Sequence, residues 1–218
     1  MDNMIKTSGF NKNKMEILAL LTRLREICID PSILYENYDE GSSKIDTLLD
    51  IINEYTINKH KILLFTSFKK ALELVRTKLL ERGISSYTIA GDVPSYKRQL
   101  LVDSFNKDNT SVFLIMLKSG GTGLNLTAAD TVIHLDLWWN PKAEEQATDR
   151  THRIGQTKNV EVIKLITKGT IEEHILDLQE KKKILSDKIL DDNLSDSNYL
   201  KSLTENDIRN ILAYENND

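Results

Sequence analysis

Residues 112–141 read VFLIMLKSGGTGLNLTAADTVIHLDLWWNP and contain two apolar runs separated by a glycine-rich segment. Its first six residues form a continuous apolar run, which is typical of a strand buried on both faces of a parallel sheet. A second apolar run, TVIHL at 131–135, predicts another buried strand. Between the runs, the glycines at 120, 121 and 123 indicate a turn whose backbone amides can approach a phosphate or another domain closely, because glycine has no Cβ.

A helix is predicted directly after these strands, because Pro141 suits the first turn of a helix. This helix carries Gln146, Asp149, Arg150 and Arg153. The two arginines are three residues apart, so on a helix they share one face and can meet a single polyanion. Each feature alone also has a plain structural explanation. A glycine turn after a strand is usually only a turn, and two arginines at helical spacing more often form a solvated face.

Before this stretch, helices and buried strands alternate along the chain. An amphipathic helix is predicted from Lys14 to Ile29, where Asp30 and Pro31 end it, and the polar, acidic segment 35–43 suits a linker. Further helices are predicted from 44, at 68–82 and from 95, with strands at 61–65 and 87–90. This alternation predicts an α/β fold with a parallel sheet and helices on both faces.

The turn after the strand at 61–65 is a candidate anion site. Thr66 and Ser67 stand between that strand and a helix amino terminus, where free backbone amides and the helix macrodipole favour a phosphate. A plain serine N-cap explains the same residues equally well.

The carboxyl-terminal part of the sequence predicts a strand at 160–166 and then helices. Thr170 and Glu173 have the spacing of a capping box, and they precede an apolar stripe that reaches Ile189. A helix of about twenty residues would be about 30 Å long, enough to cross a domain. A last short helix is predicted at 203–214.

Composition excludes several classes of protein. The chain has 218 residues, of which 40% are hydrophobic, and it contains no apolar run long enough to span a membrane and no signal-peptide pattern. Its single cysteine, Cys28, cannot form an internal disulfide and is expected to be a reduced core thiol rather than a nucleophile.

The net charge is −4, but residues 59–118 hold eleven Lys and Arg against five Asp and Glu. Such a block suits a groove along a phosphate backbone, and a lysine-studded solvated helix explains it equally well.

The motifs themselves resemble those of a known family. The string GGTGLNLTAADTVIHLDLWWNP, followed by QATDRTHRIGQ at 146–156, is similar to motifs V and VI of the Swi/Snf-type DNA translocases, which are helicase-like ATPases of superfamily two. RNA helicases of that superfamily are similar only at a coarser level and are not expected to carry WWNP or HRIGQ. LTRLREICIDP at 21–31 resembles the lead-in to the family's second motor lobe, with Asp30 where a histidine is more usual.

The resemblance implies three regions. Residues 1–43 would form a helical lead-in and linker, residues 44–168 the second RecA-like lobe with motifs IV, V and VI, and residues 169–218 a C-terminal brace helix and helical tail. The chain contains no G-x-x-x-x-G-K-[ST] loop and no D-E-x-H string. ATP and Mg²⁺ would therefore be bound mainly by a first lobe, and the separate chain is expected to be inactive as an ATPase.

The resemblance also implies roles for individual residues. Arg150 and Arg153 would be arginine fingers, Gln146 would position the γ-phosphate or the attacking water, and Asp149 would orient the arginines. Gly121, Thr122 and Gly123 would bind the nucleotide and lie between it and the DNA.

Six residues would contact nucleic acid on the same resemblance: Ser67, Lys69, Gly91, Arg98, Lys118 and Trp139. For Arg98, mere solvent exposure is the alternative, and for Trp138 and Trp139 it is a place in the core. His134 and His152 have no partner at metal-ligand spacing, so no metal site is predicted.

The expected partners are double-stranded DNA and the first RecA-like lobe of the same protein. The alternatives are a non-catalytic DNA-binding or protein-binding module and an RNA helicase lobe, which WWNP and HRIGQ disfavour. Frequent Asn, Ile and Lys are typical of an AT-rich genome, which predicts a bacterial, cytoplasmic protein associated with the nucleoid. The biological substrate is not identified by any of these patterns.

Overall fold

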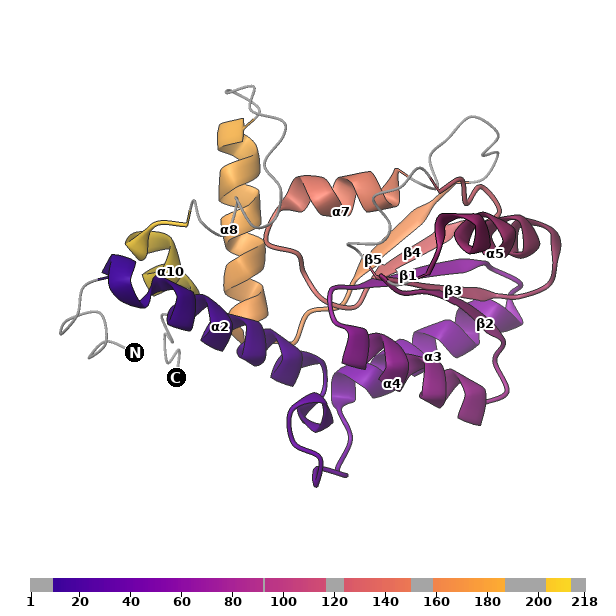
Figure 1. The fold of residues 1–218 in the computed structure, drawn as a ribbon, viewed down its shortest axis with the longest axis horizontal. Helices are drawn as coiled ribbons and strands as arrows, with labels where there is room; N and C mark the ends of the chain where they lie inside the picture. The colour runs from indigo at the N-terminus through magenta and orange to yellow at the C-terminus, as the bar shows by residue number, and fades with distance from the viewer. Residues whose placement is uncertain (1–9, 92, 117–123, 150–158, 187–202, 213–218) are drawn as a thin grey trace.

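The computed structural model describes residues 10–91, 93–116, 124–149, 159–186 and 203–212 (Figure 1). Its centre is a parallel five-stranded sheet in the order β2-β3-β1-β4-β5. The strands are β1 (Ile62–Thr66), β2 (Ser86–Ile89), β3 (Val112–Met116), β4 (Thr131–His134) and β5 (Glu161–Lys164). The α/β fold predicted from the sequence is therefore confirmed.

Helices cover both faces of the sheet. α3 (Ser43–Ile57) and α4 (Lys69–Glu81) lie on one face, below the sheet in Figure 1, and α5 (Ser95–Lys107) and α7 (Pro141–Thr148) lie on the other. The central strand β1 explains why both faces are covered, because all five of its residues are buried. Ile62 and Leu64 pack in the cluster with α3 and α4, whereas Leu63 and Phe65 pack in the cluster with α5 and α7.

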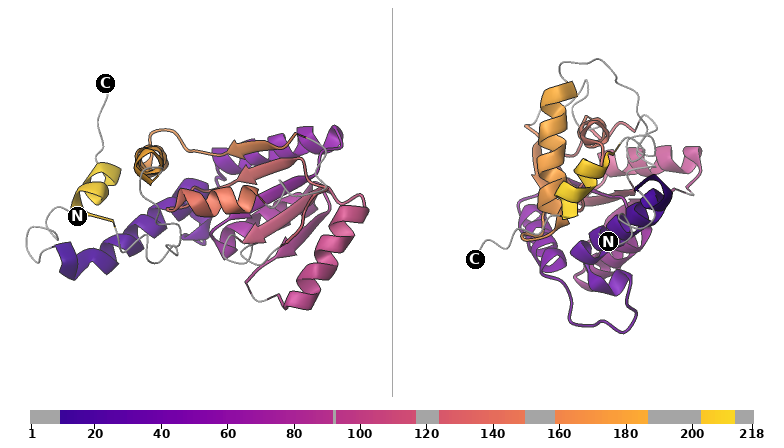
Figure 2. Two further views of the ribbon diagram at one scale, coloured as in Figure 1. Left: turned by 90° about the horizontal axis from the view of Figure 1, so that it is seen from above. Right: turned by 90° about the vertical axis from the view of Figure 1, so that its left-hand side faces the viewer.

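Three more helices gather at one end of the sheet, as Figure 1 and the left view of Figure 2 show. They are α2 (Phe10–Ile29), α8 (Ile171–Ser186) and α10 (Glu205–Leu212), and a 3₁₀ turn, η1 (Pro31–Ile33), follows α2. Buried residues of all three helices belong to the same core cluster as α5 and α7. The helical lead-in and the brace helix, although far apart in sequence, thus pack together beside the lobe.

Some element boundaries differ from the sequence prediction. The helix predicted to carry Asp149 and both arginines ends at Thr148, and Asp149 is its C-cap. Helix α4 begins at Lys69 with Phe68 as N-cap, so Ser67 is not a serine N-cap. At α8, Thr170 and Glu173 both cap the helix as predicted, but each side chain binds the amide one residue before the one that a capping box uses. Glu173 Oε2 accepts from the Gly169 amide at 2.8 Å, and Thr170 Oγ1 accepts from the Glu172 amide at 3.2 Å.

Within the described ranges, none of the helices combines the length and the apolar character that a membrane span requires.

Candidate functional site

Asp136 organises the carboxyl edge of the sheet, where β1 and β4 end side by side. Its side chain is fully buried. Oδ1 accepts hydrogen bonds from Thr66 Oγ1 at 2.7 Å and from the Ser67 amide at 2.9 Å. Because the ends of neighbouring parallel strands meet at one edge, this carboxylate after β4 can fix the turn after β1.

Arg25 reaches the same carboxylate from α2. Its Nη2 atom lies 2.7 Å from Asp136 Oδ2 and 3.3 Å from Ser67 Oγ, and it also donates to the carbonyl oxygen of Leu137. The guanidinium carbon lies 5.1 Å from the ring centroid of Phe68 and 5.2 Å from that of Trp139, within the range of cation–π attraction. Neither member of this buried pair was predicted as a site residue. Asp136 has a local signal, because it is the one acidic residue in HLDLWW at 134–139, whereas Arg25 has none, because Arg23 and Glu26 beside it are charged as well.

The turn after β1 offers fewer free donors than the sequence suggested. The Ser67 amide already donates to Asp136, and the Phe68 amide donates to Thr66 Oγ1 at 3.3 Å. Lys69 is the cation available there, since its side chain is 59% exposed and its nearest carboxylate, Glu73, is 3.9 Å away. A phosphate at this turn would meet chiefly the Lys69 ammonium.

Arg98 holds the turn that precedes α5. Its Nε donates to the carbonyl oxygen of Val93 at 2.6 Å, and its Nη2 donates to that of Gly91 at 3.3 Å. The side chain is half-buried, so simple solvent exposure is wrong for Arg98. Gly91 itself is exposed.

Both tryptophans of WWNP are buried, with 5% of Trp138 and 3% of Trp139 exposed. This burial favours a place in the core for both tryptophans. It argues against the expectation that Trp139 contacts nucleic acid. A ring that is covered by protein has no free face on which a base can stack.

Glu144 and Gln179 connect α7 to α8. Glu144 Oε1 accepts from the Trp138 amide at 2.6 Å and from Gln179 Nε2 at 3.1 Å, and Glu144 forms an ion pair with Lys164. Gln179 Nε2 also donates to the Trp138 carbonyl. The brace helix is thereby fixed to the segment that leads into α7.

Six predicted site residues lie outside the described residues: Lys118, Gly121, Thr122, Gly123, Arg150 and Arg153. The side chain of Gln146 is also outside the described part, although its backbone belongs to α7. Asp149 is exposed at the end of that helix. Their predicted roles therefore stay predictions.

His134 is fully buried, whereas Cys28 is only partly buried, so the expected core position of the thiol is only partly met. The His134 ring stacks on Phe65, with centroids 5.6 Å apart, and burial lowers the pKa of His134. Burial likewise raises the pKa of Cys28 above its usual range, which disfavours the thiolate. Over the described ranges, no group of three or more His, Cys, Asp or Glu side chains is placed to hold a metal ion.

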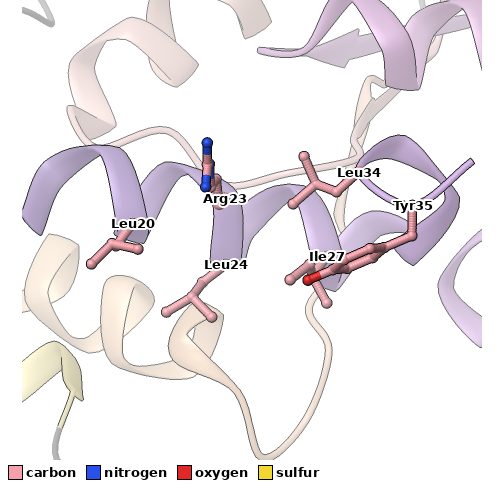
Figure 3. Close-up of a pocket in the computed structure, with 6 residues that line it drawn as sticks. All are labelled: Leu20, Arg23, Leu24, Ile27, Leu34 and Tyr35. Atoms are coloured by element: carbon pink, nitrogen blue, oxygen red, sulfur yellow. The ribbon is translucent and has the colours of Figure 1, made fainter. Parts of the chain in front are cut away.

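A groove of about 460 Å³ lies along α2 and the segment that follows η1 (Figure 3). It is mostly apolar, with one basic side chain, and the described residues that line it are Leu20, Arg23, Leu24, Ile27, Leu34 and Tyr35. None of these residues was a predicted site residue, and the groove is separate from the turn that carries Ser67 and Lys69.

Comparison with known proteins places these observations in a family context. Residues 43–155 match the family model of the helicase conserved C-terminal domain. The chain is 40% identical over 203 residues to an uncharacterized ATP-dependent helicase of Mycoplasma pneumoniae, covering 93% of the chain and 19% of that protein. It is 36% identical over 219 residues to a putative ATP-dependent helicase/translocase of Bacillus subtilis, covering 97% of the chain and 23% of that protein. The chain thus spans about a fifth of the length of these relatives.

Solved structures from Sulfolobus solfataricus are also similar. A SWI2/SNF2 ATPase C-terminal domain aligns with a TM-score of 0.74 and 28% identity, covering 98% of the chain and 88% of that domain. A SWI2/SNF2 ATPase core in complex with double-stranded DNA aligns with a TM-score of 0.75 and 32% identity, covering 96% of the chain and 44% of that core.

Proposed function

The chain belongs to the helicase conserved C-terminal domain family, in its Swi/Snf-type branch, and from this premise we propose that it is the second motor lobe of an ATP-dependent translocase on double-stranded DNA. The observation that carries the proposal is the family match over 43–155. This range includes both the glycine-rich segment GGTG at 120–123 and the segment QATDRTHRIG at 146–155. The DNA-bound structural neighbour supports duplex DNA as the partner.

In the proposed mechanism a first lobe binds ATP and Mg²⁺, and this lobe closes over them. Arg150 and Arg153 then neutralise the charge that develops on the γ-phosphate, and Gln146 positions the γ-phosphate or the attacking water. Asp149 orients the arginines. Gly121, Thr122 and Gly123 lie between the nucleotide and the DNA, so closure and strand contact occur together.

The DNA contacts proposed for this lobe involve four cationic or hydroxyl-bearing side chains and one glycine. Lys69 and Lys118 supply charge to phosphates, and Ser67 contributes its hydroxyl. Arg98 and Gly91 act together, because the guanidinium of Arg98 holds the backbone of the turn in place. Trp139 has no contact with DNA in this proposal. Association with the bacterial nucleoid stays a prediction.

This chain alone is proposed to be inactive as an ATPase, because it lacks the phosphate-binding loop and the magnesium-binding carboxylates. The test is ATP hydrolysis with and without duplex DNA, by this chain alone and by the protein that joins it to its first lobe. We expect DNA-stimulated turnover only for the joined protein. Arg153→Ala should lower that turnover about a thousandfold or more.

Arg209→Ala is the matched control, since Arg209 is a half-exposed arginine that pairs with Glu205 on α10 at 2.8 Å. We expect it to keep the wild-type rate within about twofold, as surface substitutions usually do. If the joined protein is folded but does not hydrolyse ATP, the arginines are not fingers and the chain is a non-catalytic binding module.

A further inference from the structure

Arg25 lies outside the family match at 43–155, but its guanidinium is at the centre of the carboxyl edge of the sheet. Only 4% of the residue is exposed. An arginine is seldom buried so completely unless its charge is paired. Here it pairs with Asp136, which follows β4, so a helix outside the matched domain contributes a charge to the interior of the lobe.

The two oxygens of Asp136 have different partners. Oδ2 faces Arg25 at 2.7 Å, and Oδ1 accepts from the Thr66 hydroxyl and the Ser67 amide. Any shift of the carboxylate toward or away from Arg25 therefore changes its hydrogen bonds to the turn after β1. This turn leads directly into Lys69, the exposed cation at the start of α4.

Arg25 also contacts the segment that leads into α7. It donates to the Leu137 carbonyl, and its guanidinium lies over the Trp139 ring. α7 starts at Pro141 and carries Gln146. One side chain thus joins the turn at 66–69 to the segment at 136–141.

We propose that Arg25 is a positioning residue, which holds these two segments in one fixed relation so that DNA contact at the first is coupled to nucleotide contact through the second. The coupling of DNA contact to nucleotide contact rests on the proposed function, whereas the contacts of Arg25 with the two segments do not. Arginine suits this place because its Nη2 atom reaches a carboxylate, a hydroxyl and a carbonyl oxygen while the face of its guanidinium packs on the rings of Phe68 and Trp139. A lysine would keep the charge beside Asp136 and lose the planar face that packs on the two rings.

A buried ion pair with no positioning role is the competing explanation, and a matched pair in the same chain tests it. Lys44 and Glu172 are buried to the same extent, with side chains 4% and 1% exposed, and their charged atoms are 2.6 Å apart. Among the described residues, the further hydrogen bonds of this pair go to the Leu135 carbonyl and the Thr167 amide, and none reaches the turn at 66–69. Arg25→Lys and Lys44→Arg are therefore equivalent conservative changes at two buried pairs.

The first measurement uses this chain alone and needs no enzymatic activity. Hydrogen exchange of the Ser67 amide reports its bond to Asp136, and tryptophan emission reports the Arg25–Trp139 contact, because the chain has only the two adjacent tryptophans. We expect Arg25→Lys to speed exchange at Ser67 by about tenfold or more and to shift the emission to longer wavelength. Lys44→Arg should leave both signals at wild-type values, even if the two variants have the same free energy of unfolding. Unchanged Ser67 exchange in Arg25→Lys overturns the inference.

The second measurement uses the protein that joins this chain to its first lobe. The readout is the ratio of ATP turnover with saturating duplex DNA to turnover without DNA. We expect Arg25→Lys to lower this ratio about tenfold and Lys44→Arg to preserve it. Equal losses in the two variants, or loss of both rates in proportion, would show that Arg25 only stabilises the fold.

The two measurements separate failure of the inference from failure of the proposed function. If the wild-type protein shows no stimulation by DNA, the proposed function fails, while Ser67 exchange and tryptophan emission still decide whether Arg25 joins the two segments. If stimulation is present and the ratio is unaffected in Arg25→Lys, the proposed function stands and the inference fails.

Discussion

The ammonium of Lys44 lies 2.6 Å from both carboxylate oxygens of Glu172, although the two residues are 128 positions apart in the chain. Both side chains are buried. The ammonium also donates to the Leu135 carbonyl at 3.1 Å, and Glu172 Oε2 accepts from the Thr167 amide at 2.8 Å. The pair therefore fixes the first turn of the brace helix α8 to the first turn of α3 and to the end of β4.

Breaking this pair should destabilise the fold strongly. Lys44→Met leaves a buried carboxylate without its counter-charge, and we expect the free energy of unfolding in urea to fall by about 3–5 kcal/mol. Adding Glu172→Met should recover about 1 kcal/mol or more, because two apolar side chains need no partner. Lys69→Met, at the exposed pair with Glu73, should change the free energy by less than about 1 kcal/mol. Strict additivity of the two buried substitutions would contradict this account.

Gln179 should also stabilise the junction between α8 and the lobe. Gln179→Ala removes the donor that serves the Trp138 carbonyl and Glu144 Oε1, leaving buried acceptors with one partner fewer. We expect the free energy of unfolding to fall by about 1–3 kcal/mol, measured by urea denaturation. The neighbouring Glu180 is exposed on the same helix, so Glu180→Ala should change it by less than about 0.5 kcal/mol. Equal effects of the two substitutions would mean that the contact contributes nothing.

The fold was predictable from sequence because its central strands are continuous apolar runs. Residues 112–116 and 131–134 form strands where the runs at 112–117 and 131–135 predicted them. Such strands are buried on both faces, so their sequences need no alternation of apolar and polar residues. The end of α4 was also predictable, because Gly83 follows that helix with φ of +70°. The region boundaries at 43/44 and 168/169 stay predictions.

The contacts around the site were not predictable by the same reasoning. Arg25 and Asp136 are 111 residues apart, and local spacing carries no information about such a pairing. The end of α7 was missed because the residues after Thr148 contain no proline or glycine before Gly155 to stop a helix. The sequence around Ser67 predicted a free backbone amide. It carries no information about Asp136, 69 residues further on, whose carboxylate accepts the hydrogen bond from that amide.

His134 should make the fold less stable in mild acid. Desolvation by burial lowers the pKa of His134 in the folded state below its value of about 6.5 in the unfolded chain, and Glu144 partly offsets the shift. The unfolded chain then binds more protons below that pH, so stability is present above it and is lost as pH falls, by at most about 1.4 kcal/mol per pH unit for this residue.

Urea denaturation at pH 7.5, 6.5 and 5.5 measures this dependence. We expect His134→Phe to remove that part of the acid-side slope. Thr148→Val removes the hydroxyl 3.3 Å from Nε2 but keeps the titrating ring, so it should keep the slope even if the overall stability changes. An identical slope in wild type and His134→Phe would show that other groups produce the acid sensitivity.

Lys69 should account for about one phosphate contact in the binding of duplex DNA by the protein that joins this chain to its first lobe. Each neutralised phosphate contributes about 0.9 to the slope of log K against log salt concentration, so Lys69→Ala should reduce that slope by about this amount. Fluorescence anisotropy of a labelled duplex between roughly 50 and 200 mM salt measures it. Lys78 is the control, because it lies near the other end of α4 and pairs with Glu81 at 3.2 Å. If Lys78→Ala reduces the slope as much as Lys69→Ala, the effect is one of net charge, and the turn after β1 does not contact the DNA backbone.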